Sequence, residues 1–156
     1  MQFLFPKQPL RQEQKRIIIC DLERGRNIRR SEINTSDDKI TVSYSDKPVL
    51  SYQISTAFPA DTLPAYYQRS GFIHPMYSPD GTVLSDDFPK GHTHQHAVFF
   101  AWVNAFWQGH KTDFWNQQHG EGTVRNSGVV ESISGSVYGR FETQQEHLGI
   151  VEETQR

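Results

Sequence analysis

The stretch DKITVSYSDKPVLSYQI, residues 38–54, decides the fold class of this chain. Apolar Ile40, Val42 and Tyr44 alternate with Thr41 and Ser43. A period of two is typical of a β-strand with one buried face and one exposed face. The letters SDKP form a turn signal, and the apolar run that follows them predicts a second strand. The segment therefore predicts a β-hairpin.

Other parts of the chain carry similar strand signals. We expect strands over residues 17–22, 129–134 and 137–142, the last two joined at Gly135 and Ser136. The apolar run over residues 97–103 predicts a central strand that is covered on both faces. Helix signals are confined to residues 60–68 and to the stretch near 104–109. Many short strands with glycine and proline between them predict an all-β, antiparallel β-sandwich with less than about a tenth helix.

Length and composition limit the classes of function. The 156 residues suit one domain, which we place at 17–156 after an N-terminal extension at 1–16. A net charge of −2, with no nucleic-acid-binding motif, argues against a nucleic-acid partner. No apolar run approaches the ~20 residues of a membrane helix, and no signal-peptide pattern is present. The single cysteine, Cys20, excludes an internal disulfide framework and suits a cytoplasmic protein.

Histidine is concentrated in the segment GHTHQHA, residues 91–97. If a strand begins near His92, then His92, His94 and His96 leave one face, with neighbours ~6.6 Å apart. Two neighbouring imidazoles can ligate one divalent ion such as Zn²⁺, whereas the outer pair, ~13 Å apart, cannot join them without a bulge. The spacing favours a two-histidine site and leaves His96 outside it. A surface or hydrogen-bonding role for these histidines stays open as the alternative.

Further candidate residues lie before and after this segment. Arg69 and His74 fall in one short stretch, and His74 precedes a proline that favours extended backbone. Trp115 offers an apolar ring face on which a sugar can stack. Glu121 is the acid that follows Trp115, and it is a candidate proton carrier. Each of these residue types, taken singly, more often serves structure.

Four segments in order resemble one bacterial family. They are RSGFIHPMYSPDGTVLSDDFP at 69–89, HTH at 92–94, VFFAWVN at 98–104 and DFW at 113–115. Their combination resembles the methane-oxygenase PmoA-like family, a domain of unknown function. The specific match covers residues 66–126, and a weaker match in strand pattern runs from residue 17 to the C-terminus.

The chain departs from that family's pattern at its histidines. The family has Asp-His-Pro-His-His-Arg-Gly where this chain has GHTHQHA, so His92 and His94 carry over. Gln95 replaces a third histidine, His96 replaces an arginine, and Asn126 stands where a later family histidine falls. Family members are usually longer. The resemblance therefore implies a partial supersandwich similar to that of the aldose mutarotases, in a setting of carbohydrate metabolism.

These observations together predict a protein that binds a small carbohydrate or sugar derivative and needs no cofactor. If it is an enzyme, we expect general acid–base catalysis on a sugar, with His92 or His94 moving the proton and Glu121 as the partner acid. Two alternatives stay open. One is a metal-dependent enzyme that uses His92 and His94 as ligands of an ion such as Zn²⁺. The other is a non-catalytic sugar-binding or assembly module.

The same hypothesis gives the binding residues and their placement. We expect Arg69 and His74 to hold hydroxyls or a carboxylate, and Trp115 to stack on the sugar ring. His74, His92, His94 and Trp115 are expected to line one cleft. Strand edges left open in a sandwich also predict a homo-oligomer, because unpaired edges recruit partners.

Overall fold

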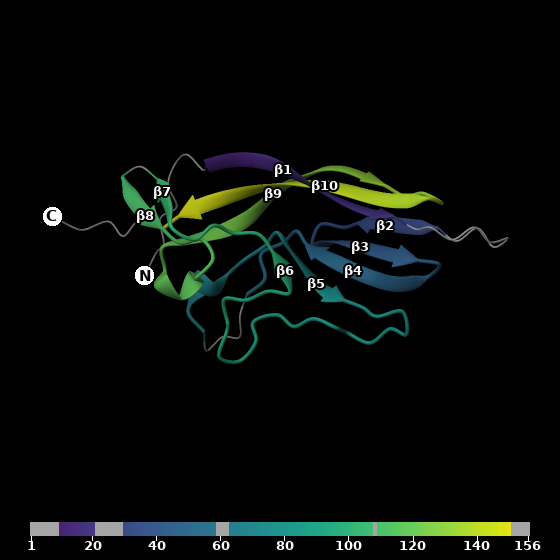
Figure 1. Ribbon diagram of the computed structural model, residues 1–156, viewed down its shortest axis with the longest axis horizontal. Coiled ribbons are helices and arrows are strands. Elements are labelled where there is room, and N and C mark those ends of the chain that lie inside the picture. The colour runs from purple at the N-terminus through teal and green to yellow at the C-terminus, as the bar shows by residue number, and fades with distance from the viewer. Residues whose placement is uncertain (1–9, 21–29, 59–62, 108, 151–156) are drawn as a thin grey trace.

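The computed structural model describes residues 10–20, 30–58, 63–107 and 109–150. One antiparallel sheet has three strands in the order β1 (Leu10–Cys20), β10 (Tyr138–Gly149) and β9 (Gly122–Ile133). A second antiparallel sheet has five strands, in the order β2 (Ser31–Thr35), β3 (Lys39–Tyr44), β4 (Lys47–Gln53), β5 (Phe72–Met76) and β6 (Val98–Phe99). A short hairpin joins β7 (Ala105–Trp107) to β8 (His110–Thr112). Figure 1 shows the two larger sheets as stacked layers.

The core lies between these two sheets. Alternation along β3 turns Ile40 and Val42 inward, where both are buried. Phe141 of β10 reaches the same cluster from the other sheet, and its ring centroid lies 5.5 Å from that of Tyr52. The fold is thus the all-β, sandwich-like arrangement that the period of two predicted.

The two sheets are joined at one end by β2 and the β9–β10 turn. Ser31 and Gly135 exchange two backbone hydrogen bonds of 2.9 and 3.0 Å. The Ile33 N–H donates to Ser134 Oγ at 2.8 Å. A Cβ atom on Gly139 would lie 3.0 Å from Ser31 Cβ, so the close approach of the sheets here depends on glycine.

Several predicted elements are confirmed with changed bounds. The hairpin expected at residues 38–54 is β3 and β4, and the expected strands at 129–134 and 137–142 belong to the longer pair β9 and β10. The strand expected at 17–22 begins earlier, at Leu10, and residues 21–29 lie outside the described part. The helical turn expected within 60–68 is the single 3-10 turn η1 (Ala65–Tyr67), with residues 59–62 also outside the described part.

Two expectations are wrong. Residues 97–103 are not a central strand, because only Val98 and Phe99 join the sheet, at its edge. Phe100 and Trp102 of this run pack instead on the buried His147 of β10, with Trp102 stacked on it at 4.6 Å, whereas Val98 and Val103 are exposed. Residues 104–107 and 109 are not helical, because β7 and β8 pair there and Gly109 has φ 83°, while residue 108 lies outside the described part.

Helices are short in the part of the chain that the structure describes. Besides η1 there is one 3-10 turn, η2 (Gln117–His119). No helix within the described ranges has the length and apolar character required to cross a membrane.

The first prediction concerns the core. We expect Phe141→Ala to lower the free energy of unfolding by about 3–5 kcal/mol, because it removes a buried ring and leaves a cavity between the sheets. Urea unfolding measures the change. Val137→Ala is the control, since Val137 is 67% exposed and its truncation opens no cavity. A loss no larger than that of the control would contradict this account of the core.

Candidate functional site

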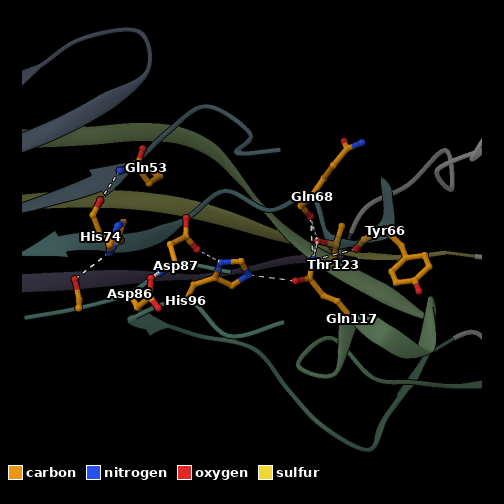
Figure 2. Close-up of polar contacts among 10 residues, drawn as sticks. Gln53, Tyr66, Gln68, His74, Asp86, Asp87, His96, Gln117 and Thr123 are labelled. Carbon is orange, nitrogen blue, oxygen red and sulfur yellow. Dashed lines mark hydrogen bonds and ion pairs between the residues drawn. The ribbon is translucent and has the colours of Figure 1, made fainter. Parts of the chain in front are cut away.

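His96 is one of several buried polar residues at one end of the five-stranded sheet. Its residue is 1% exposed. Its Nδ1 lies 2.5 Å from Asp87 Oδ1, and its Nε2 lies 3.2 Å from Gln117 Oε1. Asp87 and His96 also face each other across an isolated antiparallel bridge. Figure 2 shows the ring held between these two partners, which come from different segments of the chain.

The orientation of the Gln117 amide fixes the role of the imidazole. Gln117 is buried, and its Nε2 contacts the carbonyls of Tyr66 and Gln68 at 3.2 and 2.9 Å and Thr123 Oγ1 at 3.0 Å. Carbonyls only accept, so the amide nitrogen must face them and Oε1 must face His96. His96 Nε2 is therefore a donor. Because Nδ1 faces a carboxylate, both ring nitrogens are engaged with acceptors.

Aromatic rings surround this histidine. Phe72 lies against one face with its centroid at 4.6 Å, and Phe88 and Phe99 meet the ring edge-on at 4.7 and 5.5 Å. The enclosure excludes water, so the two hydrogen bonds act in a medium of low dielectric constant. His96 therefore positions its neighbours and has no nitrogen left for a substrate.

Arg69 lies next to this cluster and is also 1% exposed. Its Nη2 donates to the carbonyl of Phe114 at 2.8 Å, and its guanidinium carbon lies 4.8 Å from the centroid of Phe99. Nη1 has no hydrogen-bond partner among the described residues. Burial lowers the pKa of Arg69 to about 9, so the group remains charged at neutral pH.

Trp115 extends this stack toward the surface. Its ring centroid lies 4.3 Å from that of Phe99, and the residue is partly exposed. Its backbone N–H donates to Asp113 Oδ1 at 2.9 Å. Burial alone would raise the pKa of Asp113, but the hydrogen bonds from Asn116 and Trp115 outweigh it and the pKa is lowered. Asp113 therefore remains ionised and holds the Trp115 loop.

Glu121 supports the same loop. Its Oε2 accepts the backbone N–H of Asp113 at 2.8 Å. The carboxylate thus helps to position the backbone that leads to Trp115, and its role as partner acid stays a prediction.

His92 and His94 lie on a loop and not on a strand. The Phe88 N–H donates to the Gln95 carbonyl, and a turn closes with the Gln95 N–H donating to the His92 carbonyl at 2.8 Å. The two imidazole centroids are 6.2 Å apart. His92 is exposed, whereas His94 is partly buried.

The electrostatic surroundings of His94 link it to the rest of the cluster. Burial lowers the pKa of His94, and the positive groups of His92, His96 and Arg69 lower it further against the opposing charge of Asp113. His94 is therefore neutral at neutral pH, with one nitrogen free to accept a proton. His94 thus lies within electrostatic range of Arg69 and Asp113, and Phe99 contacts both Arg69 and Trp115.

His74 lies beside the network and is held separately. Its Nδ1 is 3.0 Å from Ser85 Oγ, and its carbonyl accepts a hydrogen bond from Gln53 Nε2. In Figure 2 it lies on the Asp86 and Asp87 side of His96. Among the described residues, His74 forms no hydrogen bond or ring contact with His92 or His94. The placement of His74, His92, His94 and Trp115 in one cleft stays a prediction.

Sequence reasoning missed the residues that organise this site. His96 was placed outside it, and Asp87 and Gln117 were not considered. A signal existed for Asp87, because it lies in the SDDFP segment just before the histidines. Gln117 gave none, since a glutamine between Asn116 and Gln118 is typical of a polar loop.

A cleft of about 420 Å³ lies elsewhere, near the β3–β4 turn. None of the predicted site residues lines it. Its walls are formed by Tyr44, Ser45, Lys47, Pro48, Val49, Tyr77, Ser78 and Pro79. This cleft is at the far end of β4 and β5 from Arg69 and Phe72, given the pairing of Leu50 with Met76 and of Gln53 with Phe72.

Comparison with known proteins gives one match. A family model described as a family of unknown function (DUF6807) matches residues 39–155 and so spans the whole candidate site. No curated protein and no solved structure matches the chain. The match agrees with the expected domain of unknown function, and its description mentions neither the PmoA-like family nor the mutarotases.

The second prediction tests the buried network. His96→Phe keeps a ring in the aromatic enclosure but leaves Asp87 and Gln117 Oε1 without a donor. We expect the free energy of unfolding to fall by about 2–5 kcal/mol, as for other buried groups that lose their partner. Gln118→Ala is the control, because Gln118 is exposed. Equal stability of the two variants would refute the central role of His96.

The third prediction concerns the protonation of His94. Its folded-state pKa lies below the ordinary 6.5, so on acidification the unfolded chain takes up a proton before the folded chain does. The free energy of unfolding should therefore fall as pH drops below about 6.5 toward the folded-state pKa. NMR titration of the imidazole should give a midpoint below 6.5. His94→Gln should reduce the pH dependence in this window, whereas His110→Gln, at an exposed position, serves as the control.

Proposed function

The chain belongs to the DUF6807 family, whose function is unknown, and we propose that it binds a small carbohydrate or sugar derivative on the surface formed by Trp115, His92 and His94. The observation that carries this proposal is the stack of Arg69, Phe99 and Trp115. Phe99 contacts the Arg69 guanidinium at 4.8 Å and the Trp115 ring at 4.3 Å. Trp115 is thereby a supported, partly exposed aromatic surface.

Such a surface suits the face of a sugar ring. The C–H groups of a pyranose are apolar and pack on an aromatic ring, while its hydroxyls need donors and acceptors at the edge. His92 and His94, on the loop between Phe88 and Gln95, supply imidazole nitrogens of both kinds. A ligand that is apolar on one face and polar at its rim matches this combination.

Rigidity also supports a binding role. The Asp113 carboxylate accepts the N–H groups of Trp115 and Asn116 at 2.9 and 2.8 Å, and Glu121 accepts the N–H of Asp113. Three hydrogen bonds thus fix the backbone on which Trp115 stands. A preorganised side chain loses little entropy when a ligand stacks on it, and this favours affinity.

General acid–base catalysis on a sugar is the second candidate function. The lowered pKa of His94 favours it, because a neutral imidazole at neutral pH can take a proton from a sugar hydroxyl or carbon. Glu121 keeps one carboxylate oxygen, Oε1, outside the Asp113 hydrogen bond. Within the described residues no cluster of three or more histidine, cysteine or acidic side chains could hold a metal ion.

The resemblance to the PmoA-like family supports the same proposal. The segments that carry it include Arg69, His92, His94 and Trp115. Its implied setting is carbohydrate metabolism, and this points to a sugar-derived ligand.

The fourth prediction tests the stacking surface. Trp115→Ala should weaken binding of a sugar ligand at least tenfold, about 1.4 kcal/mol, because the stacked face is lost. Isothermal titration calorimetry against a panel of hexoses and their uronates measures the affinity. Phe106→Ala is the matched control, since Phe106 is a 76% exposed aromatic residue on β7.

The control variant should bind as the parent does. If both variants bind the sugar with unchanged affinity, the ligand does not stack on Trp115. If no sugar in the panel binds to the parent chain, the proposed function is wrong.

A further inference from the structure

We propose that the ligand at this surface is anionic, a sugar that carries a carboxylate such as a uronate, and that Arg69 supplies the fixed positive charge that selects it. The inference rests on the proposed function and names its substrate class. Its starting point is a buried charge that has no ion-pair partner among the described residues.

The Arg69 guanidinium is buried, and no acid of the described residues forms an ion pair with it. The residue is 1% exposed. Its interactions among the described residues are one hydrogen bond to the Phe114 carbonyl and the contact with the Phe99 ring, while Nη1 has no partner there. Buried charges in proteins are normally paired, because desolvation is costly. An unpaired guanidinium therefore calls for a functional explanation.

The acids of the neighbourhood are committed to other groups. Asp87 bonds to His96, and Asp113 accepts the N–H groups of its own loop. Glu121 accepts the Asp113 N–H. None of the three reaches Arg69, so the site presents one positive charge that none of them neutralises.

The Arg69 charge lies near the surface on which the proposed ligand would stack. Phe99 lies against both the guanidinium and the Trp115 ring, so the charge is close behind the stacking surface. Nη1 is covered by protein atoms, and the guanidinium therefore acts through its field and not by a direct hydrogen bond. A field that crosses packed aromatic rings is screened less than a field in water.

The histidine loop completes the anion site. Burial lowers the pKa of His94, and the positive groups of His92, His96 and Arg69 lower it further against the opposing charge of Asp113, so the ring lies within range of the Arg69 charge. A carboxylate placed there would accept hydrogen bonds from the His92 or His94 imidazoles. It would also balance the charge of Arg69. A neutral hexose would make the same stacking contact without this gain.

The experiment compares sugars that differ only at C6. Glucose with glucuronate, galactose with galacturonate, and mannose with mannuronate are titrated into the whole chain at pH 7 in 0.15 M salt. We expect at least one uronate to bind tenfold or more tightly than its neutral counterpart. In Arg69→Met this preference should disappear, whereas Arg69→Lys should retain part of it. Arg125→Met is the matched control, because Arg125 is an exposed arginine paired with Glu146.

A measurement on the parent chain covers the case in which Arg69→Met does not fold. Binding of the uronate should raise the pKa of His94, followed by NMR of the imidazole, because the carboxylate offsets the positive groups around it. Equal affinity for acidic and neutral sugars, with both lost in Trp115→Ala, would overturn the anion preference and leave the proposed function standing. Absence of binding by every sugar would overturn both.

Discussion

The two hydrogen bonds of His96 are the constraint on which the candidate site depends. One nitrogen meets Asp87 and the other meets Gln117, so the ring joins the segment before the histidine loop to the segment after Trp115. Gln117 in turn reaches the carbonyls of Tyr66 and Gln68, which precede Arg69. Three segments that are far apart in sequence are therefore tied to one imidazole. Removal of that ring would break the link between the Asp87 segment and Gln117.

Aromatic rings pack around His96 and against the charged Arg69. Phe99 contacts His96, Arg69 and Trp115, and it is therefore the common neighbour of the network, the buried cation and the exposed surface. Phe99 can do this because β6 is only two residues long and lies at the sheet edge. In a longer strand through residues 97–103, successive side chains would point to alternate faces of the sheet. The early end of β6 thus explains both why the predicted central strand is absent and why Phe99 can contact His96, Arg69 and Trp115.

The sequence predicted contacts between residues close together in the chain and missed contacts between residues far apart. The hairpin of β3 and β4 and the pair β9 and β10 were predicted, because their partners are neighbours in sequence and their side chains alternate. The pairing of β1 with β10 could not be read from local pattern, since it joins opposite ends of the chain. Phe99 and Trp102 belong to an apolar run whose composition suits a buried strand equally well. Periodicity alone does not distinguish a sheet from an aromatic cluster.

The limit of local sequence pattern also explains why the sequence did not indicate that His96, and not His92 or His94, forms the buried hydrogen bonds of the site. His92 and His94 were predicted to act through strand spacing, yet they lie on a turn whose geometry the spacing does not specify. His96 was set aside because it appeared too distant to join them. Its partners lie 9 and 21 positions away, so only the folded chain reveals that both its nitrogens are occupied. An imidazole with both nitrogens bonded has none left for a ligand, whereas His94 is partly exposed and its pKa is lowered by burial. The histidine that holds the surrounding segments together and the histidine proposed to meet a ligand are thus different residues of one segment.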